Sequence, residues 1–433
     1  MQKLTSLALA AAFAYAQPAW SAPNFKVVFG FAGAKNGANP FAALINDSAG
    51  TFYGTTGSGG KTYNGVVYKL TPPAAGLKKW QQTVIYRFKG GNDGANADGP
   101  LVMDAHGALY GTTQWGGTGG FNGTIFRLTP VAGKTEWHET VLYRFGDNDG
   151  TDPVSGLVID ENGNLFGTAC GCGLGASSRG TVFELSPPKS GKTKTDQTWT
   201  YTILHAFSGG KDGGFPYAGL VRDPSGALYG TTGGGGARNA GTVYRMTPPA
   251  QGQTDWTETV LYSFRGTKDG AYPHGGVMRD AATGDLYGTT QAGGAGDFGN
   301  GFGVVYKLSP PSGSGAWTMQ TLYRFTGLQD GAQPAATVVE DASGTLYGST
   351  PLGGDITDCA VMPGEVPGCG VVYQLTPPAG GQKAWTETVL HAFTGGNDGN
   401  GAWGGLLEAG GTLYGTTELA GPHFAGTVFT ITP

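Results

Sequence analysis

The chain has 433 residues, of which 81 are glycine and only 13% are charged, and its formal net charge is −5. This mildly acidic balance argues against a nucleic-acid partner, which needs a basic surface, and glycine without a Gly-X-Y period excludes collagen. The apolar fraction of 39% is enough to bury a core, so the glycine content indicates many tight turns rather than disorder.

The N-terminus has the features of a secretory signal. Lys3 precedes a small-residue apolar run over residues 4–16, which is too short to span a bilayer. Ala14-Tyr15-Ala16 offers a cleavage site before Gln17. We therefore expect residues 1–22 to be a signal peptide and short leader, and the mature protein to be secreted or periplasmic. No later run is apolar enough for a membrane helix, so we expect no direct membrane insertion.

One phrase, Tyr-Gly-Thr-Thr with small variations, recurs at intervals of roughly 60 residues through the chain. Its seven copies start at Tyr53, Tyr110, Phe166, Tyr229, Tyr287, Tyr347 and Tyr414. Each repeat contains four strand-like runs, which in the second repeat cover residues 101–104, 108–113, 123–129 and 137–145. No segment after the signal has a sustained helical period. The pattern predicts an all-β protein, a seven-bladed β-propeller of four-stranded antiparallel blades forming a single domain over residues 25–433.

The two ends of this domain are complementary. Residues 25–31 are an orphan copy of the fourth strand, and residues 426–433 are a third strand with no fourth strand after it. We expect the N-terminal strand to complete the last blade beside the last three C-terminal strands, because closure protects the edge strands.

The unit Tyr-Gly-Thr-Thr…Gly-Gly…Gly-Thr-Val-Phe/Tyr-x-Leu-Thr, followed by Leu-Tyr-x-Phe…Asp-Gly-Ala-x-Pro, resembles the GloVer tandem repeat of exported bacterial proteins. The resemblance covers residues 25–433. It implies export, often with a C-terminal sorting or anchoring segment, whereas this sequence ends with the last predicted blade. The resemblance supplies no catalytic residues.

Four cysteines fit an oxidising compartment. Cys170 and Cys172 lie in the third repeat, and Cys359 and Cys369 lie in the sixth, nearly opposite in a ring of seven. A disulfide needs Cα atoms within about 7 Å. We therefore predict a Cys359–Cys369 disulfide, while Cys170 and Cys172 either bridge locally or stay reduced.

The loop from each fourth strand to the next blade has the pattern Phe-x-Gly-x-x-Asp-Gly-x-x-Pro. Its acidic position holds Asp93, Asp149, Asp212, Asp269, Asp330 and Asp398, with Asn36 in the first copy. A ring of carboxylates could bind calcium, but one residue type at the same turn in six blades favours a structural role, with the Asp side chain bonding nearby backbone amides. Nor do the six histidines have zinc spacing. We expect no metal and no cofactor.

By contrast, the position after the proline of this loop varies between blades. It holds Phe41, Asp98, Val154, Tyr217, His274, Ala335 and Trp403. If the innermost strands line a central channel, these residues ring its mouth. Trp115 is a further tryptophan off the strand pattern, in a loop on the same face. Exposed aromatic rings beside a carboxylate suit sugars, so we predict a ligand site formed by Phe41, Asp98, Tyr217, His274, Trp403 and Trp115; drift at a solvent-exposed position is the alternative.

Three functions fit this sequence. The first is an exported binding or scaffold propeller that holds a glycan, a small molecule or a protein partner at the channel mouth, as a monomer. The second is a polysaccharide- or lactone-acting enzyme in which Asp98, His274 and Glu418 supply acid–base groups on the same face. The third is a purely structural surface protein. The fold alone cannot decide among them.

Overall fold

The structure is a computed structural model, and it describes residues 23–117, 120–146, 149–171, 179–189, 198–295, 301–355, 359, 366–380 and 382–433. The predicted signal peptide over residues 1–22 lies outside the described residues, and so does Cys172. No helix in the described part of the chain is long and apolar enough to cross a membrane.

The described residues form seven four-stranded antiparallel sheets. The innermost strands are β2 (Ile45–Asn46), β6 (Val102–Met103), β10 (Val158–Ile159), β14 (Val221–Arg222), β18 (Met278–Arg279), β22 (Val339–Glu340) and β26 (Leu407–Ala409). The second strands are β3 (Phe52–Thr56), β7 (Leu109–Thr113), β11 (Leu165–Ala169), β15 (Leu228–Thr232), β19 (Leu286–Thr290), β23 (Leu346–Thr350) and β27 (Thr412–Thr417). The third strands are β4 (Val66–Thr71), β8 (Thr124–Thr129), β12 (Thr181–Ser186), β16 (Thr242–Thr247), β20 (Val304–Ser309), β24 (Val371–Thr376) and β28 (Thr427–Thr432). The outermost strands are β5 (Gln81–Arg87), β9 (His138–Arg144), β13 (Thr200–Ala206), β17 (Thr257–Ser263), β21 (Thr318–Arg324), β25 (Thr386–Ala392) and β1 (Asn24–Gly30).

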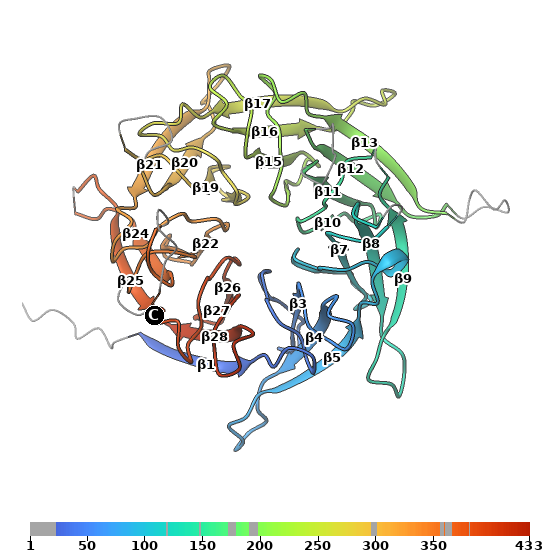
Figure 1. The fold of residues 1–433 in the computed structure, drawn as a ribbon. Coiled ribbons are helices and arrows are strands. Elements are labelled where there is room, and N and C mark those ends of the chain that lie inside the picture. The colour runs from blue at the N-terminus through green and yellow to red at the C-terminus, as the bar shows by residue number, and fades with distance from the viewer. Residues whose placement is uncertain are drawn as a thin grey trace, which may run out of the picture.

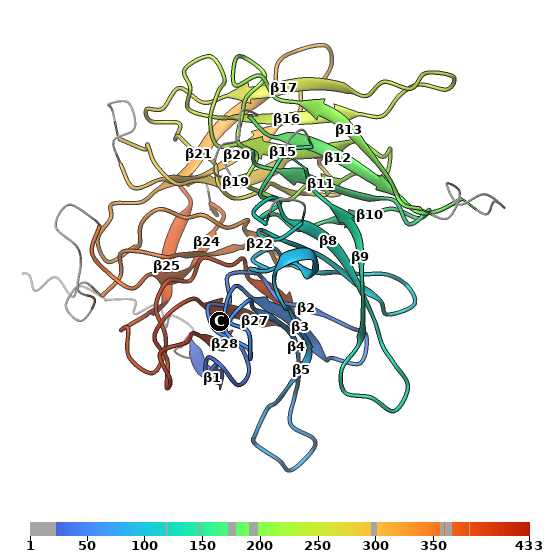
Figure 2. The same ribbon diagram turned by 45° about the vertical axis from the view of Figure 1, so that its right-hand side comes forward.

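The sheets stand as blades around a central axis, which confirms the predicted seven-bladed β-propeller (Figure 1). A view turned by 45° shows the blades stacked face to face around the ring (Figure 2). The predicted closure is also confirmed: β1 pairs antiparallel with β28 from Asn24 opposite Thr432 to Gly30 opposite Thr427, and β26, β27 and β28 complete that blade. We number the blades 1 to 7 from β2, so that blade 7 contains both ends of the described chain.

The first two residues of the repeated Tyr-Gly-Thr-Thr sequence pack inside a blade. The glycine lies under the aromatic ring of the third strand: a Cβ on Gly54 would come within 2.5 Å of the Tyr68 hydroxyl oxygen, and one on Gly111 within 2.7 Å of the Phe126 ring. Both rings are fully buried. The tyrosine before the glycine reaches the Asp of the preceding hairpin turn, as Tyr53 does by donating to Asp47 at 3.1 Å.

The two threonines join the blades to one another and close the loops. The first donates its hydroxyl to a carbonyl at the start of the next blade's innermost strand, as Thr55 does to Gly99 at 3.2 Å and Thr231 to Gly275 at 2.9 Å. The same bond from Thr416 to Ala42, at 3.2 Å, links blade 7 to blade 1. The second threonine holds the turn that follows it. The phrase therefore recurs because its glycine leaves room for a buried ring and its hydroxyl groups make hydrogen bonds that recur from blade to blade.

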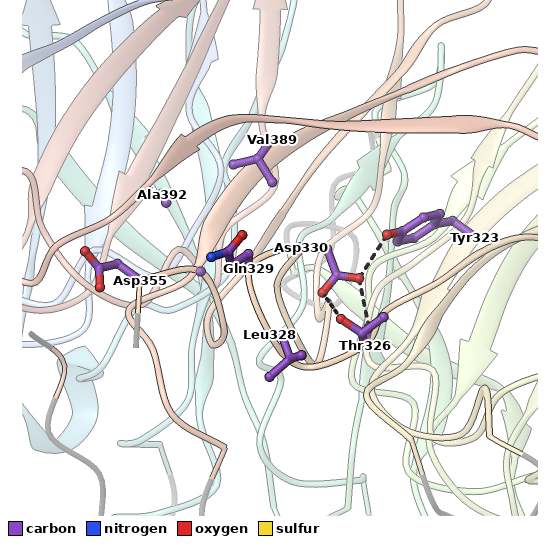
Figure 3. Close-up of a pocket in the computed structure, with 9 residues that line it drawn as sticks. Tyr323, Thr326, Leu328, Gln329, Asp330, Asp355, Val389 and Ala392 are labelled. Carbon is purple, nitrogen blue, oxygen red and sulfur yellow. Dashed lines mark hydrogen bonds between the residues drawn. The ribbon is translucent and has the colours of Figure 1, made fainter. Parts of the chain in front are cut away.

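The Asp residues that recur in the loops between blades have the structural role that the sequence analysis favoured. Asp330 accepts hydrogen bonds from the Tyr323 hydroxyl at 2.9 Å and from the amide and hydroxyl of Thr326 at 2.8 and 2.5 Å (Figure 3). His205 and His391 take the place of this tyrosine in blades 3 and 6, where they contact Asp212 and Asp398.

The predicted disulfide is confirmed. Cys359 and Cys369 are bonded in the blade 6 loop between β23 and β24, with their Cα atoms 5.6 Å apart. Both sulfurs lie against Gly395, in the loop that leads from β25 to blade 7. The bond therefore fastens the enlarged loop next to the junction of blades 6 and 7.

Candidate functional site

All seven residues at the variable position line one cavity of about 270 Å³ at the centre of the ring. They are Phe41, Asp98, Val154, Tyr217, His274, Ala335 and Trp403, one from each blade, and each side chain is partly exposed. The next two residues of every blade also line this cavity or lie against it. The floor is largely alanine, glycine and serine, so the variable side chains set the shape and chemistry of the opening.

A repeated backbone geometry puts these side chains there. The residue two positions before each of them has a positive φ, between 55° and 61° at Asn39, Asn96, Asp152, Phe215, Tyr272 and Gln333, with Gly401 in blade 7. Its carbonyl accepts the amide of the residue after the Thr-Thr pair, as Asn96 accepts from Gln114 and Gly401 from Glu418, both at 2.9 Å. Non-glycine residues seldom adopt this conformation. Its recurrence gives the positive-φ residue, the variable residue and the residue after the Thr-Thr pair the same arrangement in each blade.

Blades 7, 1 and 2 form the acidic side of the opening. Asp98 accepts a hydrogen bond from the Asn96 side-chain amide at 2.7 Å, and the same amide group donates to Gln114 at 2.5 Å. Burial, followed by the nearby charge of Glu418, raises the pKa of Asp98 to about 7. Burial also raises the pKa of Glu418, although hydrogen bonds from Trp403 and Asn39 oppose the shift. The charge of Glu418 in blade 7 therefore acts on the carboxyl group of Asp98 in blade 2.

Blades 4 and 5 form an aromatic side. The Tyr217 and His274 rings stack with centroids 4.4 Å apart and an interplanar angle of 19°. Burial lowers the pKa of His274 to about 4, so this imidazole is neutral at physiological pH. Next to them in blade 3, burial raises the pKa of Asp152 to about 6. On the other side Phe41 and Trp403 contact each other with centroids 6.3 Å apart.

The structure brings together most of the predicted site residues. Phe41, Asp98, Tyr217, His274 and Trp403 share the cavity. Glu418 does not line the cavity, but its carboxylate accepts a hydrogen bond from the side chain of Trp403, which does. Trp115 does not line the cavity.

Trp115 is 45% exposed and pairs through its backbone with Ala95. It is the second residue after the Thr-Thr pair, following Gln114. The sequence analysis did not predict the roles of Asn39 and Asn96. Their constant position, two residues before the variable residue, is the feature that could have revealed them.

No group of three or more His, Cys, Asp and Glu side chains that could hold a metal ion occurs among the residues for which the structure gives positions.

Comparison with solved structures gives the fold alone. A fungal alcohol oxidase of the AA5 family, solved in complex with copper, aligns with a TM-score of 0.55 at 14% identity and covers 92% of this chain and 75% of that one. PorZ, a bacterial surface component of the type-IX secretion system of Porphyromonas gingivalis, aligns with a TM-score of 0.49 at 14% identity. The alignment covers 93% of this chain but 48% of PorZ.

No curated protein matches the chain significantly in sequence. The model of one repeat family matches it twice, over residues 13–198 and 192–362, which together make up most of the chain. These segments contain six of the seven copies of the Tyr-Gly-Thr-Thr phrase. The chain belongs to the Gloeobacter/Verrucomicrobia repeat family.

Proposed function

We propose that this protein is an exported propeller that binds a sugar-sized ligand at its central opening. One observation carries the proposal: a position that varies from blade to blade between aromatic, acidic, imidazole and small side chains lines one cavity in all seven blades. Elsewhere the repeat keeps the residues that hold the ring together. Variation of the side chains on a cavity wall is what a binding site on a repeated scaffold requires.

The chemistry of the wall favours a sugar. Phe41, Tyr217 and Trp403 present aromatic rings, and Asp98 presents a carboxyl group beside them. Sugars pack their C–H faces on aromatic rings and form hydrogen bonds at their rims. The volume of about 270 Å³ is close to the lower end of ligand pockets, which run from about 300 Å³ upwards. One sugar residue at the end of a glycan fits these dimensions better than a long chain segment.

The test is a glycan-array screen of the mature protein and of the triple variant Phe41→Ala/Tyr217→Ala/Trp403→Ala. We expect the wild type to bind a restricted set of glycans and the triple variant to lose them. Phe424→Ala is the matched control, because Phe424 is an aromatic side chain on the loop after β27, is 86% exposed and does not line the cavity. Equal loss in this control would place binding outside the cavity, and no binding by any form would favour a structural role or a protein partner.

An enzyme is the second candidate, and the raised pKa values of Asp98 and Glu418 favour it. A protonated carboxyl beside an ionised one is the usual arrangement for acid–base chemistry on glycosides. Bound glycan would then be converted, and Asp98→Asn would abolish turnover while binding persisted. Unchanged glycan after long incubation with the wild type would exclude this candidate.

A further inference from the structure

The acidic side of the opening contains a carboxylate oxygen with no partner. Asp98 lines the cavity, and its Oδ2 accepts the hydrogen bond from Asn96 at 2.7 Å. Its Oδ1 is buried and has no hydrogen-bond partner among the described residues. A buried carboxylate oxygen left in this way costs free energy unless a ligand, an ion or water satisfies it.

The neighbouring loop leaves room for this oxygen. Gly57, the residue after the Thr-Thr pair in blade 1, lies directly against Asp98: a Cβ at this position would meet Oδ1 at 2.3 Å. The equivalent positions in blades 2, 5 and 7 hold the long side chains of Gln114, Gln291 and Glu418. Glycine at position 57 therefore allows Asp98 to lean from blade 2 towards blade 1 and Glu418.

The second carboxyl group is held in place from two sides. Glu418 accepts hydrogen bonds from Trp403 and from Asn39. The Ser58 hydroxyl in turn donates to the Asn39 side-chain oxygen at 2.5 Å. The position of Glu418 is thus fixed by neutral neighbours.

Among the residues that the structure describes, no Lys, Arg or His forms an ion pair with either acid. The cavity lining contains no Lys or Arg, and its one histidine, His274, is neutral because burial lowers its pKa to about 4. Burial and the nearby charge of Glu418 both disfavour the ionised form of Asp98, and a bound cation would relieve both effects. The rings of Phe41 and Trp403 flank the same side, and aromatic faces attract ammonium groups.

We propose that the preferred ligand is an amino sugar with a free, protonated amine, whose ammonium group binds the carboxylate of Asp98 next to Phe41 and Trp403. This inference rests on the proposed function and specifies its ligand class. The aromatic rings hold the sugar body, Asp98 and Glu418 supply the charge, and an N-acetylated or neutral sugar lacks the cation that the site needs.

The alternative for the same geometry is a protonated Asp98 that donates a hydrogen bond to a neutral sugar. The two possibilities differ in the sign of their pH dependence. An amine needs the ionised carboxylate, so its binding tightens as Asp98 loses its proton towards neutral pH. A neutral sugar that accepts from the carboxylic acid binds more weakly over the same interval.

The experiment is isothermal titration calorimetry of the mature protein with the methyl glycosides of glucosamine, N-acetylglucosamine and glucose, at about pH 5 and about pH 7. We expect the free amine to bind about tenfold more tightly than the other two at the higher pH, and its affinity to fall at the lower pH. Asp98→Asn should remove this preference and the pH dependence. Glu418→Gln should weaken the preference in the same direction.

Asp255→Asn is the matched control, because Asp255 is exposed in the loop between β16 and β17 and the change removes the same charge. It should leave the amine preference unchanged. Equal binding of all three glycosides, or tighter binding of the neutral ones at the lower pH, would overturn the amine assignment while the sugar site stands. Binding of none of the three to a folded wild type would overturn both.

Discussion

The blade interfaces on the outside of this ring are of two kinds. Between blades 2 and 3, Tyr201 of β13 stacks on Tyr143 of β9, with centroids 4.3 Å apart and an interplanar angle of 6°. Between blades 6 and 7, Phe25 of β1 stacks on His391 of β25 at 3.6 Å and 5°. In both places the second residue of the outermost strand covers the ring of the preceding blade that bonds the turn Asp.

At three other interfaces the same strand position holds a glutamate. These residues are Glu139 in blade 2, Glu258 in blade 4 and Glu387 in blade 6. Burial, followed by the charge of the turn Asp of the preceding blade, raises the pKa of each to about 7; the Asp residues are Asp93, Asp212 and Asp330. In each glutamate Oε1 is buried and has no hydrogen-bond partner among the described residues.

The difference shows that one interface can be closed by apolar contact or by a partly buried acid, with opposite consequences for pH. An aromatic pair is indifferent to protonation. A glutamate whose pKa is raised in the folded state gives its full stability below its unfolded pKa of about 4.5 and loses it as the pH rises through about 7. The carboxyl interfaces should therefore loosen towards alkaline pH, and the aromatic ones should not.

The turn aspartates limit the stability of the folded protein at acidic pH. Burial opposes the ionisation of Asp212 and Asp398, but hydrogen bonds from Ser208, and from His391 and Thr394, hold the pKa of each carboxyl below its usual value. Their stabilisation is present above the unfolded pKa and is lost as the pH falls through the folded value. We expect the melting temperature to be highest at mildly acidic pH, which a series of calorimetric scans would show.

The largest effect is expected from removing an aromatic interface. Phe25→Ala deletes the stack on His391 and the contacts with Phe393 and Phe429, and should cost about 3 kcal/mol of unfolding free energy. Chemical denaturation would measure it. Lys26→Ala, an exposed neighbour on the same strand, should change little; an equal loss would mean that the strand and not the ring pair matters.

Neutralising the carboxyl interfaces should have a smaller effect of the opposite sign. The variant Glu139→Gln/Glu258→Gln/Glu387→Gln should gain about 2 kcal/mol in total at alkaline pH, a figure discounted because the side chains are partly exposed. Its stability should also depend less on pH. Removing three exposed acids by Glu136→Gln/Glu161→Gln/Asp255→Asn is the control, and a similar flattening in that variant would point to net charge instead of the interfaces.

The smallest effect on stability is expected from a variant that keeps the ring stack of an aromatic interface and removes its hydrogen bond. Tyr201→Phe keeps the stack on Tyr143 but removes the hydrogen bond from the Tyr201 hydroxyl to the Asp149 carbonyl, 2.6 Å long. We expect a loss of about 1 kcal/mol with no change in pH dependence. Tyr63→Phe, at a side chain that is 68% exposed, should be neutral, and a loss as large as that of Phe25→Ala would contradict the division.

The fold could be predicted from the sequence because the same pattern of residues recurs seven times. Each copy of Tyr-Gly-Thr-Thr fixes the same packing, so one consistent pattern outweighs the ambiguity of any single short strand. Position relative to the repeat also predicted that Phe41, Asp98 and Trp403 share an opening.

Contacts between different blades were not predictable in the same way. The approach of Asp98 to Glu418 depends on the absence of a side chain at Gly57, and the carboxyl pair of Glu258 and Asp212 joins residues on separate blades. Repeat spacing places residues within a blade. It does not indicate which side chains lean across the gap between two blades.

The pairing of β1 with β28 also bears on how the chain is made. Residues 24–30 are synthesised early, but their partner strand, residues 427–432, is the last of the ring to appear. Until then an unpaired strand remains at each end, and exposed strand edges invite association with other chains. A product that stops before β28 cannot close its last blade. Ring closure thus requires that translation has passed β28, and chains that stop earlier keep the open edges by which proteases and chaperones can recognise them.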